Sequence, residues 1–257
     1  MLELRNIHKY YNPGTVNEMC LFEDFNLTIN QGEFVSVVGS NGSGKTSMLN
    51  IICGSIPVES GQILIDGKDI TKVKESKRNQ KIGRVYQNPF MGTWPSMTIL
   101  GNMSLADKKG RFYRLGRGTN KARIDYYREQ LAQLGLGLED KLHVKVGSLS
   151  GGQRQAMALL MSTMTPIEFL ILDEHTAALD PKTAELIMEL TDKIVKEKNL
   201  TTVMVTHNLR YAVEYGNRLI MMHQGHCVMD KAGKDKEDTS IDEILTMFNE
   251  ISIECGN

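Results

Sequence analysis

A glycine-rich loop between a strand pattern and a helical pattern constrains this chain more than any other stretch. The loop is Gly39-Ser40-Asn41-Gly42-Ser43-Gly44-Lys45-Thr46; it follows the apolar run Phe34 to Val38 and precedes the helical pattern Met48 to Cys53. Glycines permit positive φ angles at which successive N–H groups point at one anion, and a helix N-terminus adds further free donors. This order of strand, loop and helix predicts a site for the phosphates of a nucleoside triphosphate.

Two side chains of the loop have predicted roles of their own. Lys45 is expected to reach the terminal phosphates, and the Thr46 hydroxyl is expected to bind Mg²⁺. The alternative, a glycine-rich turn without a ligand, is disfavoured because both residues stand where phosphate chemistry needs them. The residues of this segment predicted to bind nucleotide are Gly39, Ser40, Asn41, Gly42, Ser43, Gly44, Lys45, Thr46 and Ser47.

Composition narrows the classes of protein. The 257 residues suffice for one large domain or a domain with an insert, and 30 basic against 31 acidic residues disfavour nucleic acid as a partner. The sequence has no apolar run of about 18 residues and no signal-peptide pattern at its start. Its four scattered cysteines read as free thiols. We therefore expect a cytoplasmic protein whose membrane role, if any, depends on another chain.

A fully apolar run, Phe169 to Leu172, indicates a buried parallel strand, and it ends in Asp173 and Glu174. Two carboxylates at the end of a buried strand are costly unless a cation or a reaction uses them. Asp173 suits the Mg²⁺ shell, and Glu174 suits a general base that orients water. The alternative is that they only cap the next helix.

Gln87 and His207 also end strand patterns, Ile82 to Tyr86 and Thr202 to Val205. Because the carboxyl ends of parallel strands share one sheet edge, both are expected near the phosphate loop. The Gln87 amide suits Mg²⁺ or the attacking water, although most glutamines are surface residues. For His207 the alternative is a structural histidine.

A second glycine-containing segment, Leu149-Ser150-Gly151-Gly152-Gln153, precedes the helical run Ala156 to Met164. It predicts another anion-binding helix N-terminus, or else a simple N-cap at Ser150. Tyr10 and Tyr11 precede the phosphate loop, where an exposed tyrosine can stack on a purine; packing beneath the loop is the alternative.

The remaining patterns concern hairpins, the tail and one basic run. Asp66-Gly67 and His223-Gln224-Gly225-His226 predict hairpin turns, with solvated imidazoles favoured over a metal at the second. Ser240 and Glu243 form a capping box for a tail helix whose apolar stripe is expected to dock on the domain's own surface. Lys108 to Arg123 contains no acid and reads either as a solvated loop or as a contact for an acidic partner or lipid headgroups.

Together, and in this order, the motifs resemble those of the ATP-binding cassette (ABC) family, the nucleotide-binding subunits of transporters. The resemblance runs from about Leu2 to Met229. It implies an α/β fold: a RecA-like P-loop NTPase core with a mostly parallel sheet, an antiparallel β subdomain and an inserted α-helical subdomain. The expected organisation is one domain over 1–257, with core and β subdomain in 1–87 and 155–230, the helical subdomain in 88–154 and a tail helix in 231–257.

The resemblance also implies roles for the motif residues, with ATP and Mg²⁺ as cofactors. Ser150 and Gly152 would face the γ-phosphate of an ATP held by a second copy of the chain, so that two copies enclose two ATPs. The implied catalytic residues are Glu174, His207, Gln87 and Lys45. The implied nucleotide contacts outside the phosphate loop are Tyr11, Ser150, Gly152, Gln153 and Asp180. The implied metal ligands are Thr46, Gln87 and Asp173.

Finer similarity concerns the transporter subgroup. Four segments are similar to those of a bacterial importer subgroup that works with a permease and a substrate-binding lipoprotein. They are Gln87-Asn88-Pro89, Gly92-Thr93, Pro95 to Thr98 and Glu174 to Ala178. Its proposed cargoes are aromatic amino acids such as tryptophan or tyrosine, and its place is the cytoplasmic face of the membrane. The alternatives are the ATPase of an exporter, a soluble ABC ATPase outside transport, and a regulator with little hydrolysis.

One residue departs from the family pattern. His175 stands where a proline is usual, directly after Glu174. A histidine so close to the expected γ-phosphate position is predicted to respond to pH.

Overall fold

The computed structural model describes residues 1–109, 119 and 121–254. The chain divides into two compact units, and each is described by itself: the first is Met1–Arg78 with Asn199–Asn257, and the second is Asn79–Lys198. The sequence-based division into 1–87, 88–154, 155–230 and 231–257 stays a prediction.

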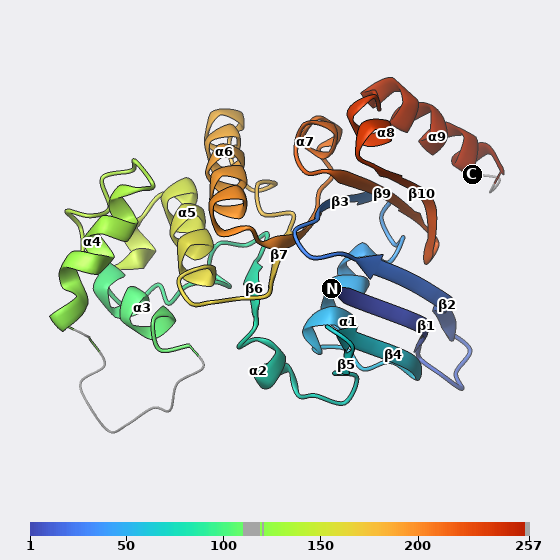
Figure 1. The fold of residues 1–257 in the computed structure, drawn as a ribbon, viewed down its shortest axis with the longest axis horizontal. Helices are drawn as coiled ribbons and strands as arrows, with labels where there is room; N and C mark the ends of the chain where they lie inside the picture. The colour runs from blue at the N-terminus through green and yellow to red at the C-terminus, as the bar shows by residue number, and fades with distance from the viewer. Residues whose placement is uncertain (110–118, 120, 255–257) are drawn as a thin grey trace. The chain divides into compact units, whose positions relative to one another are not determined.

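The first unit contains an antiparallel sheet with the strand order β2-β1-β4-β5, drawn in blue to teal in Figure 1. Its strands are β1 (Leu2–Tyr11), β2 (Met19–Ile29), β4 (Ser60–Ile65) and β5 (Lys68–Asp69). All neighbours pair antiparallel. The side chains of Leu2, Leu4 and Ile7 in β1 are buried.

Parallel strands carry the phosphate loop in the same unit. Strand β3 (Phe34–Gly39) pairs parallel with β8 (Thr201–Val205) on one side and with β9 (Arg218–His223) on the other. Strand β10 (His226–Ala232) pairs antiparallel with β9. The helices of this unit are α1 (Lys45–Cys53), α2 (Glu75–Arg78), α7 (Leu209–Glu214), α8 (Lys234–Glu237) and α9 (Ile241–Glu254).

The tail helix α9 docks on its own unit, as predicted. Ile244 is fully buried in a cluster with Leu219 and Met221 of β9. Two other apolar residues of the α9 sequence pattern, Ile241 and Leu245, are 38% and 45% exposed. The buried face is therefore narrower than the sequence pattern.

The predicted capping box of α9 is half present. The Ser240 Oγ accepts a hydrogen bond from the Glu243 backbone N–H at 3.1 Å. The Glu243 carboxylate pairs instead with the Lys231 ammonium group of β10, because an opposite charge competes with the backbone N–H for it.

The second unit joins a pair of parallel strands to helices. Strands β6 (Ile82–Val85) and β7 (Phe169–Asp173) pair parallel. Helix α5 (Gly151–Ser162) is largely buried and contacts α3 (Ile99–Ala106), α4 (Ile124–Ala132) and α6 (Pro181–Lys198), as Figure 1 shows. Two short 3₁₀ turns, Lys121–Arg123 and Val146–Ser148, complete the unit. With the sheets of the first unit, these elements confirm the predicted α/β fold class.

Part of the predicted basic run, residues 110–118 and 120, lies outside the described residues. At its edges, Lys109 Nζ donates to the Ile82 carbonyl at 2.9 Å, and Arg123 pairs with Asp107 at 3.0 Å. Cys20, Cys53 and Cys227 are free thiols, and Cys255 lies outside the described residues. Among the described helices, none is both long and apolar enough to cross a bilayer.

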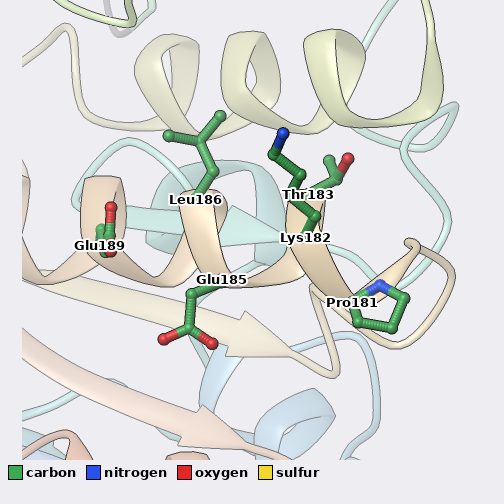
Figure 2. Close-up of a pocket in the computed structure, with 6 residues that line it drawn as sticks. All are labelled: Pro181, Lys182, Thr183, Glu185, Leu186 and Glu189. Atoms are coloured by element: carbon green, nitrogen blue, oxygen red, sulfur yellow. The ribbon is translucent and has the colours of Figure 1, made fainter.

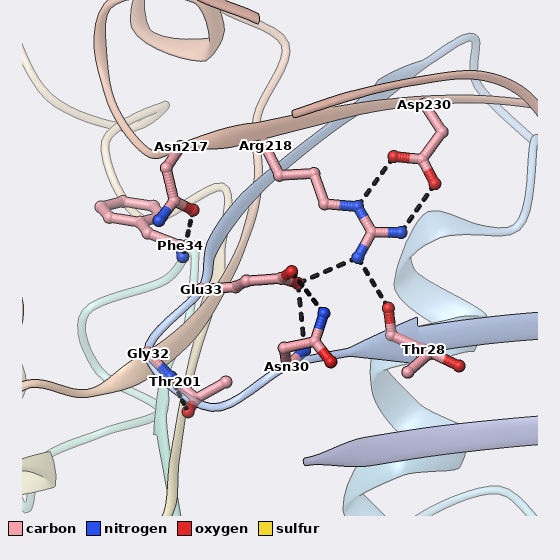
Figure 3. Close-up of polar contacts among 9 residues, drawn as sticks. All are labelled: Thr28, Asn30, Gly32, Glu33, Phe34, Thr201, Asn217, Arg218 and Asp230. Atoms are coloured by element: carbon pink, nitrogen blue, oxygen red, sulfur yellow. Dashed lines mark hydrogen bonds and ion pairs between the residues drawn. The ribbon is translucent and has the colours of Figure 1, made fainter. Parts of the chain in front are cut away.

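The half-buried guanidinium of Arg218 connects several segments of the first unit (Figure 3). Arg218 donates to both carboxylate oxygens of Asp230 at 2.7 and 2.6 Å, to Glu33 at 2.9 Å and to the Thr28 carbonyl at 2.7 Å. Burial opposes ionisation of Glu33, but hydrogen bonds from Asn30 and Arg218 lower its pKa overall. The cluster joins β9 and β10 to the end of β2 and the turn before β3, so it stabilises the base of the strand that leads to the phosphate loop.

Candidate functional site

The phosphate loop closes around the lysine that the sequence singled out. Lys45 Nζ donates to the Gly39 and Ser40 carbonyls at 2.7 and 2.8 Å and contacts Ser43 Oγ at 3.4 Å. Lys45 is only 5% exposed, whereas Thr46 presents an exposed side chain at the start of α1. The ammonium group is therefore held at the centre of the loop.

Two glycines of the loop are required by space. A Cβ at Gly39 would lie 2.2 Å from the Met222 carbonyl oxygen, and a Cβ at Gly44 would lie 2.9 Å from the Phe22 ring. Gly44 is also the N-cap of α1, with φ of 103°, so no side chain occupies the free N–H groups of the first turn. Those donors and Lys45 form a cradle that fits the phosphates of a nucleotide.

Tyr11 reaches the same helix start. Its hydroxyl lies 3.0 Å from Ser47 Oγ, and Lys9 Nζ lies 5.6 Å from its ring centroid. The ring is half-buried at the end of β1. The hydroxyl contact fixes one end of the side chain beside the loop, and purine stacking on its face stays a prediction.

His207 follows β8 and is exposed. The residue before it, Thr206, donates its backbone N–H to the Val37 carbonyl of β3 at 3.1 Å, and its hydroxyl accepts from the Asn208 N–H at 3.0 Å. These bonds fix the position of the His207 turn relative to β3, the strand that ends in Gly39. The first unit thus brings together the phosphate loop, Tyr11 and His207.

The second unit holds the predicted acidic pair. Asp173 is 9% exposed and accepts a hydrogen bond from Arg84 Nη2 at 2.7 Å. The Arg84 guanidinium also lies over the Tyr86 ring, 4.6 Å from its centroid. Sequence reasoning missed Arg84, although a charged residue inside the apolar strand pattern Ile82 to Tyr86 was a signal that a buried partner existed.

Glu174 turns the chain out of β7. Its φ is +47°, in the left-handed region that few residues other than glycine adopt, and its carbonyl accepts from the Ala177 N–H at 3.0 Å. Its side chain is half-buried. A strained backbone at this residue fits a side chain whose direction matters for function.

His175 corrects a prediction. It is 2% exposed and its Nε2 lies 3.2 Å from the Thr191 hydroxyl, which itself donates to the Ile187 carbonyl at 2.7 Å. The imidazole therefore donates to Thr191. Burial lowers the pKa of His175 to about 4. The expected response to pH near neutrality is wrong, because this histidine packs under α6 as a neutral side chain.

The remaining predicted residues lie at element ends of the second unit. Gln87 is exposed after β6. Ser150 is the N-cap of α5 and forms a reciprocal capping box with Gln153. Asp180 Oδ1 accepts from the Thr183 N–H at 3.1 Å, and this side-chain and backbone bonding lowers the Asp180 pKa. Capping, which the sequence left open for Ser150, is thus one role of its side chain.

A hollow of about 620 Å³ runs along the first turns of α6, and Figure 2 shows its lining side chains. These are Pro181, Lys182, Thr183, Glu185, Leu186 and Glu189. A Cβ at Gly152 would lie 2.1 Å from Thr183 Cγ2. Only glycine allows the start of α5 to approach α6 this closely, and the Thr183 side chain that Gly152 packs against also lines the hollow.

Comparison with known proteins agrees with these motifs. Residues 22–177 match the family model described as ABC transporter. The chain is 47% identical over 248 residues to a tyrosine transport ATP-binding protein of Clostridioides difficile, covering 96% of this chain and 98% of that protein. It is 32% identical to the glutamine transport ATP-binding protein GlnQ of Geobacillus stearothermophilus, covering 88% of each.

A solved structure is also similar. It is the dimeric post-hydrolysis state of an ATP-binding cassette bound to ADP and phosphate, which is 32% identical and matches with a TM-score of 0.76 over 90% of this chain and 98% of that one. The family match, the relatives and the phosphate-binding cradle agree. The chain belongs to the ABC transporter family, as an ATP-binding and ATP-hydrolysing subunit.

Proposed function

We propose that this chain powers the import of an aromatic amino acid, with tyrosine as the first candidate, into a bacterial cell. The observation that carries the proposal is the 47% identity to a tyrosine transport ATP-binding protein across nearly the full length of both chains. The importer-like residues around Gln87 and Glu174 support the same subgroup. The chain itself would supply nucleotide chemistry and no cargo contact.

The phosphate loop would hold ATP through charge and backbone donors. Lys45, already centred by three oxygen contacts, would exchange them for β- and γ-phosphate oxygens. Tyr11 would stack on the adenine, with its hydroxyl on Ser47 limiting its rotation. The residues Gly39, Ser40, Asn41, Gly42, Ser43 and Gly44 would contribute loop contacts.

The residues present fit Mg²⁺. This ion takes few protein ligands beside phosphate oxygens and waters, and Thr46, Gln87 and Asp173 offer one hydroxyl, one amide and one carboxylate. The Asp173 carboxylate is held in place by the Arg84 guanidinium at 2.7 Å. Within the described part of the chain no cluster of three or more His, Cys, Asp or Glu side chains is arranged for a metal, which is compatible with a phosphate-dependent site. Bound Mg²⁺ would neutralise phosphate charge.

Hydrolysis would depend on positioning more than on covalent chemistry. The Glu174 carboxylate, directed by its left-handed backbone, would accept a proton from the attacking water. Gln87 would orient that water, and the exposed His207 would donate a hydrogen bond to the γ-phosphate.

A second copy of the chain would complete each site. Ser150, Gly152 and Gln153 lie at the N-terminus of α5, where free N–H groups suit a phosphate. Asp180 caps the neighbouring α6, and the hollow beside it offers room for the partner's surface. ATP would close this dimer, and hydrolysis would release it.

Permease subunits would bind the second unit. Phe90, Met91 and Trp94 are 50%, 66% and 58% exposed within one short segment after Gln87. Exposed apolar residues gathered in this way mark interaction sites, and a cytoplasmic helix of the permease would cover them. The complex would then sit at the cytoplasmic face of the membrane, with a substrate-binding lipoprotein on the opposite side and no nucleic acid involved.

A Glu174→Gln variant tests the sandwich mechanism. It keeps the shape of the side chain but removes the base, so ATP should accumulate in a stable dimer that light scattering resolves from the monomer. Glu197→Gln is the matched control, because Glu197 is an exposed residue late in α6 whose pair with Lys193 spans 3.9 Å. A Glu174→Gln variant that binds ATP and stays monomeric would contradict the mechanism.

A further inference from the structure

The turn between β9 and β10 contacts the phosphate loop. The Gly225 N–H donates to the Ser43 carbonyl at 3.0 Å, although 182 positions separate the two residues in the sequence. The turn also fits tightly against β2, since a Cβ at Gly225 would lie 1.7 Å from the Leu21 carbonyl oxygen. Gly225 is therefore enclosed between β2 and the phosphate loop.

We propose that this turn is a positioning element for nucleotide binding, with Gly225 holding the Ser43–Gly44 peptide in the orientation that ATP requires. The inference rests on the proposed function of the loop as the phosphate site. Gly225 touches no substrate, so its role is to position the loop.

The reason lies in peptide geometry. A trans peptide is planar, so its C=O and N–H bonds point in opposite directions. The Ser43 carbonyl belongs to the same peptide as the Gly44 N–H. By holding that carbonyl toward the β9–β10 turn, Gly225 directs the Gly44 N–H to the opposite side, and a hydrogen bond to the carbonyl also polarises the N–H donor.

The loop needs this restraint because it is rich in glycine. Gly42 and Gly44 have φ angles of +80° and +103°, and nothing lies within 4 Å of a Cβ at Gly42. Glycine peptides on both sides of Ser43 rotate more easily than others. The Ser43 N–H already donates to the Ser40 carbonyl at 3.2 Å, and the Gly225 bond adds a restraint on the Ser43 carbonyl, on the other side of this residue.

The chain contains a matched control turn. Asp66 and Gly67, between β4 and β5, have φ angles of +48° and +75°, whereas Gln224 and Gly225 have +43° and +79°. Both are two-residue hairpin turns with positive φ at each central residue. A Cβ at Gly67 would meet nothing within 4 Å. Alanine at either glycine therefore carries the same backbone strain. Only alanine at Gly225 also displaces the N–H group that donates to the Ser43 carbonyl.

The test compares Gly225→Ala with Gly67→Ala in the full-length chain. ATP affinity is measured by calorimetric titration, and folding is measured by thermal unfolding. Loss of one hydrogen bond predicts a roughly two- to tenfold weaker ATP affinity for Gly225→Ala, with Gly67→Ala equal to wild type. Equal affinities for the two folded variants would overturn the proposal. Absence of ATP binding by the wild type would instead contradict the function proposed for the loop.

A measurement on the wild type keeps the proposal testable if Gly225→Ala does not fold. Hydrogen exchange at the Gly225 amide should slow at least severalfold when ATP is added, because ATP and the Ser43 bond favour the same loop conformation. The Gly233 amide, which donates to the Asn217 carbonyl at 3.0 Å, is the control for general stabilisation. Equal slowing at both amides, or none at Gly225, would overturn the proposal.

Discussion

Replacing Arg218 with methionine removes the guanidinium of the cluster in Figure 3 while keeping most of the apolar length of the side chain. The Arg218 side chain is 13% exposed, and its carboxylate partners Glu33 and Asp230 are 20% and 40% exposed. The substitution leaves a partly buried carboxylate and the Thr28 carbonyl without the guanidinium. We expect the folded state to lose stability without any direct change at the nucleotide site.

The expected loss follows from the contacts. The more exposed Asp230 pair contributes about 0.5–1 kcal/mol. The charge-assisted bonds to Glu33 and to the Thr28 carbonyl contribute about 1.5 kcal/mol each. Because one guanidinium makes all of them, they are not fully additive, and we expect a total near 3 kcal/mol. At about 2–4 °C for each kcal/mol, the melting temperature should fall by roughly 6–12 °C.

Urea titration and calorimetry measure this loss, with Lys196→Met as the control. Lys196 forms a 2.6 Å pair with Asp192 one helical turn away, but its side chain is 74% exposed, so removing it should cost about 0.3–0.5 kcal/mol. Similar losses of unfolding free energy in both variants would refute the reasoning.

The same cluster should respond to acid. The Glu33 pKa is lowered in the folded state, so the stabilisation that Glu33 contributes is present above its unfolded pKa and disappears as pH falls through the lowered value. The difference in free energy of unfolding between wild type and Arg218→Met should therefore become smaller in acid.

Three further substitutions follow from single contacts. His175→Gln should lose less stability than the wild type between pH 7.5 and pH 5, because a pKa of about 4 in the folded state against 6.5 in the unfolded state costs the wild type about 2 kcal/mol by pH 5. Urea titration at the two pH values measures this loss. Equal losses of unfolding free energy in the two proteins would contradict the prediction. Gly216→Ala should lose at least about 2 kcal/mol in the same titration, since its Cβ would lie 2.4 Å from the Phe34 carbonyl oxygen at φ +81°; a neutral result would show that this backbone yields. Tyr127→Phe should lose about 1 kcal/mol with the bond to Asp107 at 3.0 Å, and an unchanged calorimetric transition would refute that bond's contribution.

Local patterns were enough to predict the ends of strands and helices. The phosphate loop, the acidic end of β7 and the helix cap at Ser150 all depend on residues within a few positions of one another. The sequence also indicated both hairpin turns, because Asp-Gly and Gln-Gly between strand patterns favour positive φ. These features are properties of short segments.

Contacts between distant segments were not predictable in this way. Nothing near Arg84 in the sequence indicates that it pairs with Asp173, and nothing near Ser43 indicates Gly225. His175 was misjudged for the same reason, since only the packing of α6 over it explains its burial and its bond to Thr191. Burial in the fold determines the partners and the pKa values of such residues, and a single sequence does not show which residues are buried.

We propose that ATP hydrolysis at Glu174 drives uptake of an aromatic amino acid. The most direct measurement is uptake of radiolabelled tyrosine by cells that lack this chain and are complemented with wild type, Glu174→Gln or Glu197→Gln, with labelled glutamine as a second substrate. We expect tyrosine uptake to be lost without the chain, restored by wild type and by Glu197→Gln, and not restored by Glu174→Gln, while glutamine uptake stays constant. Tyrosine uptake that is the same in all four strains would contradict it.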